Sequence, residues 1–210
     1  MPEHYFTAEP TSELKLRSLT FAVLGIELRF LTASGVFSHR RVDTGTRVLL
    51  KSMKIPNRGQ ILDLGCGWGA IGVFIAMTHP EARVVMTDIN KRAVRLAVEN
   101  VKLNKTSAEV RCGDLYEPVS RMKFDAIVSN PPISAGFSLI IRLINEAYDH
   151  LNRGGSIQLV ARKRKGGRTI SKILSKAFGN VQEIEKKSGY TVYLSRKENE
   201  IGSEQPDKRV

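Results

Sequence analysis

A glycine-rich turn between two apolar runs constrains the fold of this chain more than any other feature. Residues 61–64 form a short apolar run that suits a buried strand, and residues 70–76 form a second run that suits a buried helix. Glycine stands at every second position between them, as Gly65, Gly67 and Gly69. Glycine allows positive φ and close backbone approach to a ligand, and a helix start offers free N–H groups to an anion. The pattern predicts the opening of a nucleotide-binding βαβ unit, although a tight turn that binds nothing has the same pattern.

Two later segments favour the ligand-binding interpretation. The apolar run 84–87 ends at Asp88, about twenty residues after the glycines, where such folds place an acid that holds ribose hydroxyls. A further expected strand, residues 124–129, continues directly into Asn130-Pro131-Pro132-Ile133. Two adjacent prolines stiffen this turn, and proline has no N–H to compete with nearby acceptors.

These features together resemble the S-adenosylmethionine-dependent methyltransferases of the Rossmann-like class. The segment Asp-Leu-Gly-Cys-Gly-Trp-Gly at residues 63–69 resembles their first motif. The Asn-Pro-Pro-Ile segment resembles their fourth motif, in the variant used to methylate exocyclic amino or amide nitrogens. The resemblance implies S-adenosylmethionine as the cofactor, with Asp63 near its methionine amino group, Asp88 on the ribose and Asp114 on the adenine. The cofactor-binding residues expected are Asp63, Gly65, Cys66, Gly67, Gly69, Asp88, Ile89, Asp114, Leu115 and Asn130, with Gly45 and Thr46 closing over the site.

The N-terminal part of the chain narrows the resemblance. His4-Tyr5-Phe6, Gly35-Val36-Phe37-Ser38 and Asp43-Thr44-Gly45-Thr46 are similar to the small-domain methyltransferase family. That family includes RsmC-like enzymes, which methylate guanine N2 in small-subunit ribosomal RNA, and short archaeal relatives. The resemblance covers about residues 4–195.

The same segments predict an α/β fold with a small extension. Alternating apolar residues on both sides of Gly25 indicate a β-hairpin, and Thr44 is expected to cap a short helix. We therefore expect an N-terminal hairpin and helix extension (1–55), a methyltransferase domain (56–197) and a mobile charged tail (198–210). Strands alternate with helices in the second region, which predicts a Rossmann-like, doubly wound sheet of seven strands. No helix separates the last two strands, so one edge strand should run antiparallel.

Amphipathic spacing places three helices within this region. They are expected at residues 91–103, capped by Asn90; at 138–151, ended by Gly154-Gly155; and at 169–178, ended by Gly179.

The Asn-Pro-Pro-Ile turn is the expected catalytic segment: Asn130, Pro131, Pro132 and Ile133. An exocyclic amino nitrogen is a poor nucleophile because its lone pair is delocalised into the ring. Oxygen acceptors on Asn130 and Pro131 would hold both N–H groups and free that lone pair. Many amino-group methyltransferases carry an aromatic residue where Ile133 stands, to stack on the target base. Phe37, Phe137 and Trp68 are the candidates to replace it here.

The charge of the chain favours a polyanionic partner. Lys and Arg number 33 against 21 Asp and Glu, which gives a formal net charge of +12. Nucleic acid is the simplest such partner, although a generally basic protein without one accounts for the charge equally well. The densest basic run is residues 162–168, and a solvated loop is its alternative interpretation. The RNA-binding residues expected are Arg40, Arg41, Arg162, Lys163, Arg164, Lys165 and Arg168, with Lys186 and Lys187 nearby.

Several classes of protein are disfavoured by the remaining composition. Cys66 and Cys112 are too few for a disulfide framework and are interpreted as small buried thiols of a reducing, cytoplasmic compartment. We expect no signal peptide, and no apolar run reaches the ~18 residues of a membrane span. The histidines lack metal-ligand spacing, so no metal site is expected.

The sequence therefore predicts an S-adenosylmethionine-dependent N-methyltransferase that acts on an exocyclic amino group of RNA. Guanine N2 of small-subunit ribosomal RNA, free or in an assembled subunit, is the favoured target. Adenine N6 of a nucleic acid and a protein glutamine amide also fit the Asn-Pro-Pro motif. More remote alternatives are an NAD(P) oxidoreductase and a non-catalytic RNA-binding protein.

Overall fold

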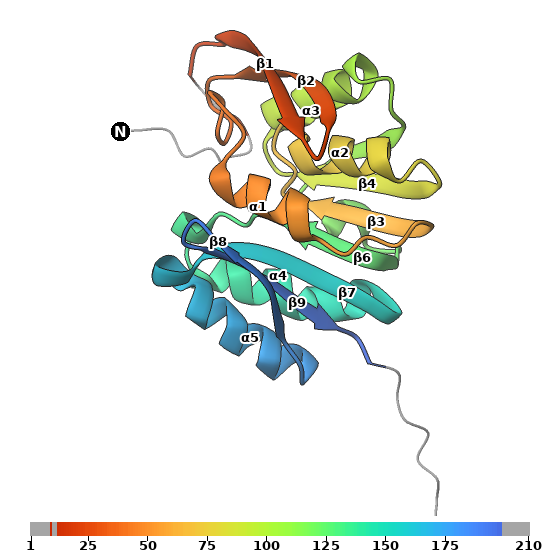
Figure 1. Cartoon of the computed structure of the whole chain (residues 1–210), viewed down its shortest axis with the longest axis vertical. Coiled ribbons are helices and arrows are strands. Elements are labelled where there is room, and N and C mark those ends of the chain that lie inside the picture. The colour runs from red at the N-terminus through yellow and green to blue at the C-terminus, as the bar shows by residue number, and fades with distance from the viewer. Residues whose placement is uncertain (1–8, 10–11, 199–210) are drawn as a thin grey trace, which may run out of the picture.

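A seven-stranded sheet forms the centre of the molecule, with helices on both of its faces (Figure 1). The computed structural model describes residue 9 and residues 12–198. The His4-Tyr5-Phe6 segment and residues 199–210 of the expected tail lie outside the described residues. The strands of the sheet are β3 (Gly59–Leu64), β4 (Ala82–Asp88), β5 (Ala108–Cys112), β6 (Phe124–Ser129), β7 (Leu151–Arg162), β8 (Gln182–Lys187) and β9 (Tyr190–Arg196).

The strand order is β5-β4-β3-β6-β7-β9-β8, and β3 to β7 run parallel. Strand β9 pairs antiparallel with both β7 and β8. The predicted antiparallel pairing at this edge is confirmed, with β9 as the reversed strand and β8 outside it. The chain winds outward in opposite directions from β3 and β6, and such a switch point opens a crevice at the carboxyl ends of the strands.

The helices divide into two groups around the sheet. Helices α1 (Thr44–Ser52), α2 (Ala70–Thr78) and α3 (Lys91–Leu103) share one apolar core with the first face. Helices α4 (Phe137–His150) and α5 (Arg168–Phe178) share the core of the other face. Three short segments interrupt the loops: η1 (Glu117–Val119), η2 (Ile133–Ala135) and η3 (Lys163–Gly167).

Helix α3 forms where its sequence predicts it. The side-chain oxygen of Asn90 accepts hydrogen bonds from the backbone N–H groups of Arg92 and Ala93, which caps the helix start. Its buried residues are Ala93, Leu96, Ala97, Asn100 and Val101, whereas Val94 and Val98, which the apolar spacing puts on one stripe with Ala97 and Val101, are half-buried. Local signals of this kind suffice for the helix because its cap and its apolar stripe agree.

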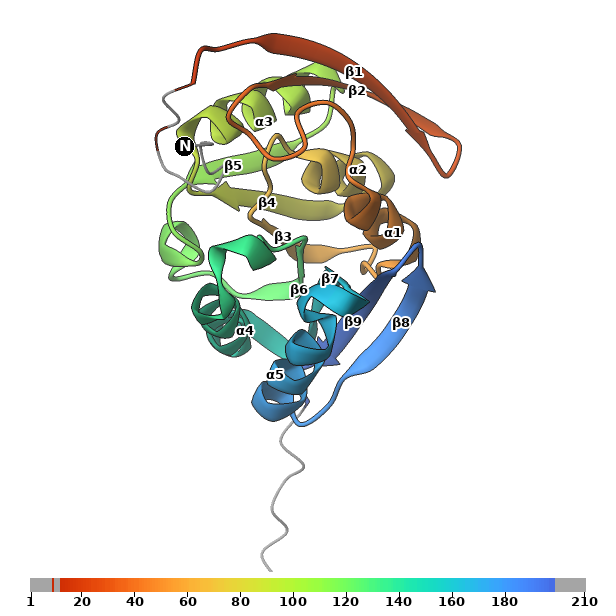
Figure 2. The same ribbon diagram turned by 90° about the vertical axis from the view of Figure 1, so that its left-hand side faces the viewer.

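The N-terminal hairpin consists of β1 (Leu16–Val23) and β2 (Ile26–Ala33) and arches over α3 and α2 (Figure 2). Asn100 of α3 binds both polar groups of the Leu31 backbone, accepting from its N–H at 2.6 Å and donating to its carbonyl at 2.8 Å. Asn104 does the same with Arg29, at 3.0 and 2.6 Å. Two helix side chains therefore stand in for the strand neighbour that β2 lacks on this side.

Two sequence expectations are wrong in detail. Asp43, not Thr44, caps α1, because its carboxylate accepts the N–H of Gly45 at 2.7 Å. Helix α4 ends at His150 and passes directly into β7, so Gly154 and Gly155 lie inside that strand. Gly154 has φ of 77°, and the β6–β7 register shifts beside this point, so the glycines mark an irregular strand rather than a helix end.

The two cysteines differ in environment. Cys66 is buried, and burial raises the pKa of its thiol well above the ordinary value. Cys112 is exposed at the end of β5, so the expectation that both thiols are buried is wrong for Cys112. None of the helices in the described part of the chain is long and apolar enough to span a bilayer.

Candidate active site

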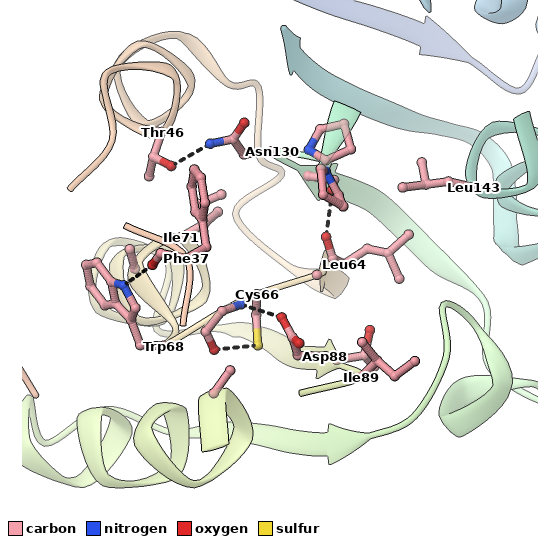
Figure 3. A pocket seen from close by; sticks show the side chains of 18 of the residues that line it. Phe37, Thr46, Leu64, Cys66, Trp68, Ile71, Asp88, Ile89, Asn130 and Leu143 are labelled. Atoms are coloured by element: carbon pink, nitrogen blue, oxygen red, sulfur yellow. Dashed lines mark hydrogen bonds between the residues drawn. The ribbon is translucent and has the colours of Figure 1, made fainter. Parts of the chain in front are cut away.

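A pocket of about 350 Å³ opens at the carboxyl ends of β3, β4 and β6, where the strand order changes direction (Figure 3). Its volume suits a nucleoside-sized ligand. The expected site residues that line it are Thr46, Gly65, Cys66, Gly67, Asp88, Ile89, Asp114, Leu115, Asn130, Pro131 and Pro132. Gly45, Asp63, Gly69 and Ile133 are not in its lining.

The glycine loop forms one wall of the pocket. Gly65 and Gly67 have φ of 71° and 56°, and a Cβ added at either would meet no atom within 4 Å. The N–H groups of Gly65 and Cys66 both donate to the carbonyl of Thr87 at 2.9 Å, which holds the loop against β4. The absence of side chains at the two glycines thus leaves space that a ligand would occupy.

Gly69 serves the packing of α2 instead. It caps that helix with φ of 90°, and an added Cβ would lie 3.3 Å from the Cβ of Ala97 in α3. This glycine lets α2 and α3 approach each other and does not touch the pocket.

Asp88 links the loop to the end of β4. One carboxylate oxygen accepts the N–H of Gly67 at 2.8 Å, and the other accepts the N–H of Asn90 at 2.8 Å. Burial raises the pKa of Asp88, and these two N–H groups oppose that rise. The carboxylate keeps free lone pairs that face the pocket, since a carboxylate offers about four acceptor sites.

Asp63 lies beneath the pocket and not on its surface. Its side chain is fully buried in β3, where Oδ2 accepts the N–H of Gly72 at 2.8 Å. Its Oδ1 is buried without a hydrogen-bond partner among the described residues. Burial raises the pKa of Asp63 to about 7; the Gly72 N–H lowers it, and the nearby Asp88 charge adds to the rise.

Asp114, which follows β5, also lines the pocket. Its carboxylate pairs with the guanidinium of Arg142 on α4 at 3.1 Å, and its backbone carbonyl accepts the N–H of Glu117. Arg142 is a partner that sequence reasoning did not identify, because the two residues come from different elements.

Asn130, at the tip of β6, points its amide nitrogen at the start of α1. Its Nδ2 donates to the hydroxyl of Thr46 at 2.9 Å and to the carboxylate of Asp43 at 3.2 Å (Figure 3). The carbonyl of Pro131, the second expected acceptor, already accepts the N–H of Ile133 at 3.0 Å. A carbonyl oxygen has two lone pairs, so one remains for a substrate.

The three aromatic candidates differ sharply in position. Trp68 is 3% exposed, packs edge-on against Phe30 and donates its indole N–H to the carbonyl of Phe37 at 3.0 Å. Phe37 lines the pocket, and Phe137 is 38% exposed at the start of α4. Phe37 and Trp68 both line the pocket, but the Trp68 ring is held in the core, whereas Phe137 is not in the lining and is exposed near its mouth beside Gly166.

Comparison with known proteins agrees with this arrangement. The sequence profile described as "Methyltransferase small domain" matches residues 27–194. The chain belongs to the methyltransferase small domain family. Family membership confirms that it is an S-adenosylmethionine-dependent methyltransferase with the Rossmann-like fold predicted from sequence.

Relatives of this methyltransferase include both short and long proteins. YbxB of Bacillus subtilis, an uncharacterised protein, is 34% identical over 200 residues, which cover 94% of this chain and 100% of the relative. Ribosomal RNA small subunit methyltransferase C of Haemophilus influenzae is 34% identical over 190 residues, which cover 88% of this chain and 56% of the relative. The chain thus spans about half the length of that enzyme.

A solved structure is similar over most of the methyltransferase. The 16S rRNA N2 methyltransferase RsmC of T. thermophilus, in complex with AdoMet and guanosine, superposes with a TM-score of 0.79 at 28% identity. The match covers 90% of this chain and 52% of RsmC.

The basic segments of the methyltransferase lie at the same end of the sheet as the pocket. Arg40 and Arg41 are exposed beside Ser38, which lines the pocket and bonds to the Arg41 carbonyl at 2.6 Å. The exposed basic run begins at Arg162, the last residue of β7. Gly166 lies within this run, and a Cβ added there would lie 3.0 Å from side-chain atoms of both Ile133 and Phe137. The β8–β9 turn adjoins the same run, because the N–H of Lys163 donates to the carbonyl of Gly189 at 3.0 Å.

Several pocket residues were not expected there from the sequence. Asp43 was expected in a family motif but not as a partner of Asn130, since 87 residues separate them. The other lining residues absent from the expected set are Ser38, Val42, Asp43, Leu64, Ala70, Ile71, Thr87, Ala93, Gly113, Ser129, Ala135, Leu139 and Leu143. Most are ordinary apolar or small residues, and only the three-dimensional fold distinguishes them from the core.

Proposed function

We propose that this methyltransferase transfers a methyl group to an exocyclic amino nitrogen of RNA, with guanine N2 of small-subunit ribosomal RNA as its target. The observation that carries the proposal is Asn130, which lines the pocket with its amide nitrogen bonded to Asp43 and Thr46. Its carbonyl oxygen is then left for a substrate N–H. The rRNA guanine-N2 activity named for T. thermophilus RsmC supports the choice of target.

The pocket residues fit S-adenosylmethionine. The open faces of Gly65 and Gly67 would lie against the methionine portion, Asp88 would accept from the ribose hydroxyls, and Asp114 from the adenine amino group. Three of the expected cofactor residues would act indirectly, from outside the pocket lining. Asp63 would fix the start of α2, Gly69 the contact between α2 and α3, and Gly45 the start of α1. When bound, this cofactor supplies an electrophilic methyl group attached to a sulfonium sulfur.

The protein has to make the substrate nitrogen nucleophilic and align it. Two acceptors, Oδ1 of Asn130 and the free lone pair of the Pro131 carbonyl, would each take one N–H of the amino group. This draws the nitrogen toward tetrahedral geometry and releases its lone pair from the ring. As the N–C bond forms and the S–C bond breaks, the nitrogen gains positive charge and loses one proton to solvent. No strong base is needed for that loss, so the chain requires only alignment and exclusion of water.

RNA would approach over the basic rim. Arg40, Arg41 and the run Arg162–Arg168 flank the pocket and are suited to phosphate contacts, which carry little sequence information. A base has to leave its stack to reach Asn130, so an exposed loop nucleotide is the expected substrate. Phe137, beside Ile133, would provide the stacking surface that isoleucine provides less well.

The alternatives differ in their target atom. Adenine N6 and a glutamine amide also present an N–H pair to Asn130, but the basic rim favours nucleic acid over protein. The family assignment argues against an NAD(P) oxidoreductase, and the pocket beside Asn130 argues against a silent RNA-binding protein.

The test is methyl transfer from labelled S-adenosylmethionine to ribosomal RNA, offered both free and in small subunits, followed by nucleoside analysis. We expect label in N2-methylguanosine and none with the Asn130→Ala variant, which should still bind the cofactor in calorimetry. Label in N6-methyladenosine or in protein would identify a different target, and unchanged transfer by Asn130→Ala would refute the role of Asn130.

A further inference from the structure

The side-chain amide of Asn130 is held in one orientation by its neighbours. The nitrogen and the oxygen of an amide have similar shapes, so hydrogen-bond partners decide which way the group faces. Asn130 Nδ2 lies 3.2 Å from Oδ2 of Asp43 and 2.9 Å from Oγ1 of Thr46. An ionised carboxylate can only accept a hydrogen bond, so the atom that faces Asp43 has to be the nitrogen.

This orientation fixes what the pocket offers to a substrate. The two terminal atoms of the planar amide point in different directions, so Oδ1 faces away from α1 once Nδ2 faces toward it. The flipped amide would present N–H donors to a substrate amino group, which also carries N–H donors, and the two would repel. A site that presents only an acceptor selects an amino group and rejects a carbonyl oxygen at the same position.

The start of α1 is itself rigidly placed. Asp43 Oδ2 also accepts the N–H of Gly45 at 2.7 Å, which makes the same carboxylate the cap of α1. Thr46 is 6% exposed, and a Cβ added at Gly45 would lie 2.8 Å from the ring of Tyr190 on β9. These contacts leave Asp43 and Thr46 little freedom to move, as a group that orients another side chain requires.

We propose that Asp43 and Thr46 are positioning residues that hold the Asn130 amide with its oxygen toward the substrate and thereby restrict the site to N–H donors. The inference rests on the proposed function, because it assigns Asn130 the acceptor role given above. It predicts that activity depends on the complementarity of residues 43 and 130 rather than on either residue alone.

The test exchanges the two side chains. In Asn130→Asp, two carboxylates face each other, and the rate of transfer should fall by at least ~10-fold at saturating cofactor. Asp43→Asn alone should keep most of the activity, because the oxygen that caps Gly45 is the same atom that accepts from Asn130. In the double variant the amide at position 43 can turn its N–H toward the new carboxylate, which still accepts from the substrate, so much of the lost rate should return. That turn gives up the bond from the Gly45 N–H, so the double variant should be less stable than either single variant.

Thr46 provides a second, independent comparison. Thr46→Val removes the hydroxyl at constant shape and should lower kcat, while Thr46→Ser keeps the hydroxyl and should retain several-fold more activity than Thr46→Val. Calorimetric cofactor affinity and thermal stability are measured for each variant, so that a loss of fold or cofactor is separated from a loss of orientation.

The outcomes are distinct. Recovery in the exchanged variant supports the proposal. A double variant no more active than Asn130→Asp, or full activity of Thr46→Val, would overturn it while the proposed function stands. Full activity of Asn130→Ala would instead show that the acceptor role itself is wrong.

Discussion

Asp88 holds Gly67 in place through a hydrogen bond of 2.8 Å from the backbone N–H to its carboxylate, 21 residues away in the chain. The end of β4 thereby sets the shape of the glycine loop that follows β3. The residue expected to bind the ribose thus also shapes the loop on which the rest of the cofactor would lie.

Replacing Asp88 should therefore weaken cofactor binding by more than the loss of a ribose contact. Asp88→Ala leaves the N–H groups of Gly67 and Asn90 without their acceptor, and we expect S-adenosylmethionine affinity to fall by roughly 10- to 100-fold in calorimetry. Asp125→Ala is the matched control, because that carboxylate accepts the N–H of Gln60 at 2.8 Å at the opposite end of β3. The control should lose stability but keep its cofactor affinity; equal loss in both variants would contradict the assignment.

The stability of the ligand-free protein should fall as the pH rises. Asp63 has a pKa of about 7 when folded and an ordinary value of 3.8. Between these values the folded protein holds a proton that the unfolded chain has released, so unfolding becomes easier with rising pH and levels off above pH 7. The raised pKa of Asp88 acts in the same direction.

Asp63→Asn removes the contribution of Asp63. Urea unfolding at pH 5 and pH 8 should show the natural protein losing on the order of 2 to 3 kcal/mol more than the variant over this range. If the unfolding free energies of the two proteins change with pH in the same way, the pKa of Asp63 is not raised in the folded protein.

Charge removal from the basic run should weaken RNA binding and flatten its salt dependence. We expect Arg164→Ala with Lys165→Ala to reduce the slope of log affinity against log salt by about 0.7 for each phosphate that is no longer neutralised. Arg83→Ala with Arg121→Ala removes the same charge near the amino ends of the strands and serves as the control. If both pairs change the slope equally, the rim is not a specific RNA surface.

The aromatic candidates should separate in mutagenesis. Trp68→Ala should cost about 3 to 5 kcal/mol of unfolding free energy, because the ring is buried against Phe30. Phe137→Ala should stay folded and raise the KM for RNA by roughly 5- to 100-fold, the range found when a base loses an aromatic stacking partner. Tyr148→Ala is the control, because Tyr148 is also 38% exposed on α4, and this variant should leave the KM for RNA unchanged. An unchanged KM for Phe137→Ala would leave Phe37 as the stacking residue.

Caps and apolar spacing in the sequence correctly predicted helices whose ends do not depend on distant residues. The Asn90 cap and the apolar stripe define α3 completely, and the αL conformation of Gly179, φ 73°, ends α5 as predicted. Gly154 and Gly155 misled the prediction because glycine marks both helix ends and strand irregularities, and only the β6 neighbour decides between them. Composition also could not separate Cys66 from Cys112, since burial at the end of a short strand depends on the neighbouring loops.

The sequence predicted the motif residues of the pocket but not the contacts between distant residues. Gly65, Gly67, Asp88 and Asn130 line one pocket because the carboxyl ends of parallel strands in a doubly wound sheet lie at one edge. Asp63 differs because its side chain points toward α2, where it accepts the N–H of Gly72, and it therefore lies below the pocket. The bonds from Asn130 to Asp43 and Thr46 span 87 and 84 residues, a separation at which spacing carries no information.

The docking of the hairpin through Asn100 also sets an order of events during synthesis. Leu31 leaves the ribosome 69 residues before the asparagine that completes its hydrogen bonding. At translation rates of 5 to 20 residues per second, that interval is roughly 3 to 14 s. For that time Phe30 and the rest of the hairpin's apolar face have no helix to cover them, so the nascent chain must be shielded or remain unstructured there until α3 has emerged.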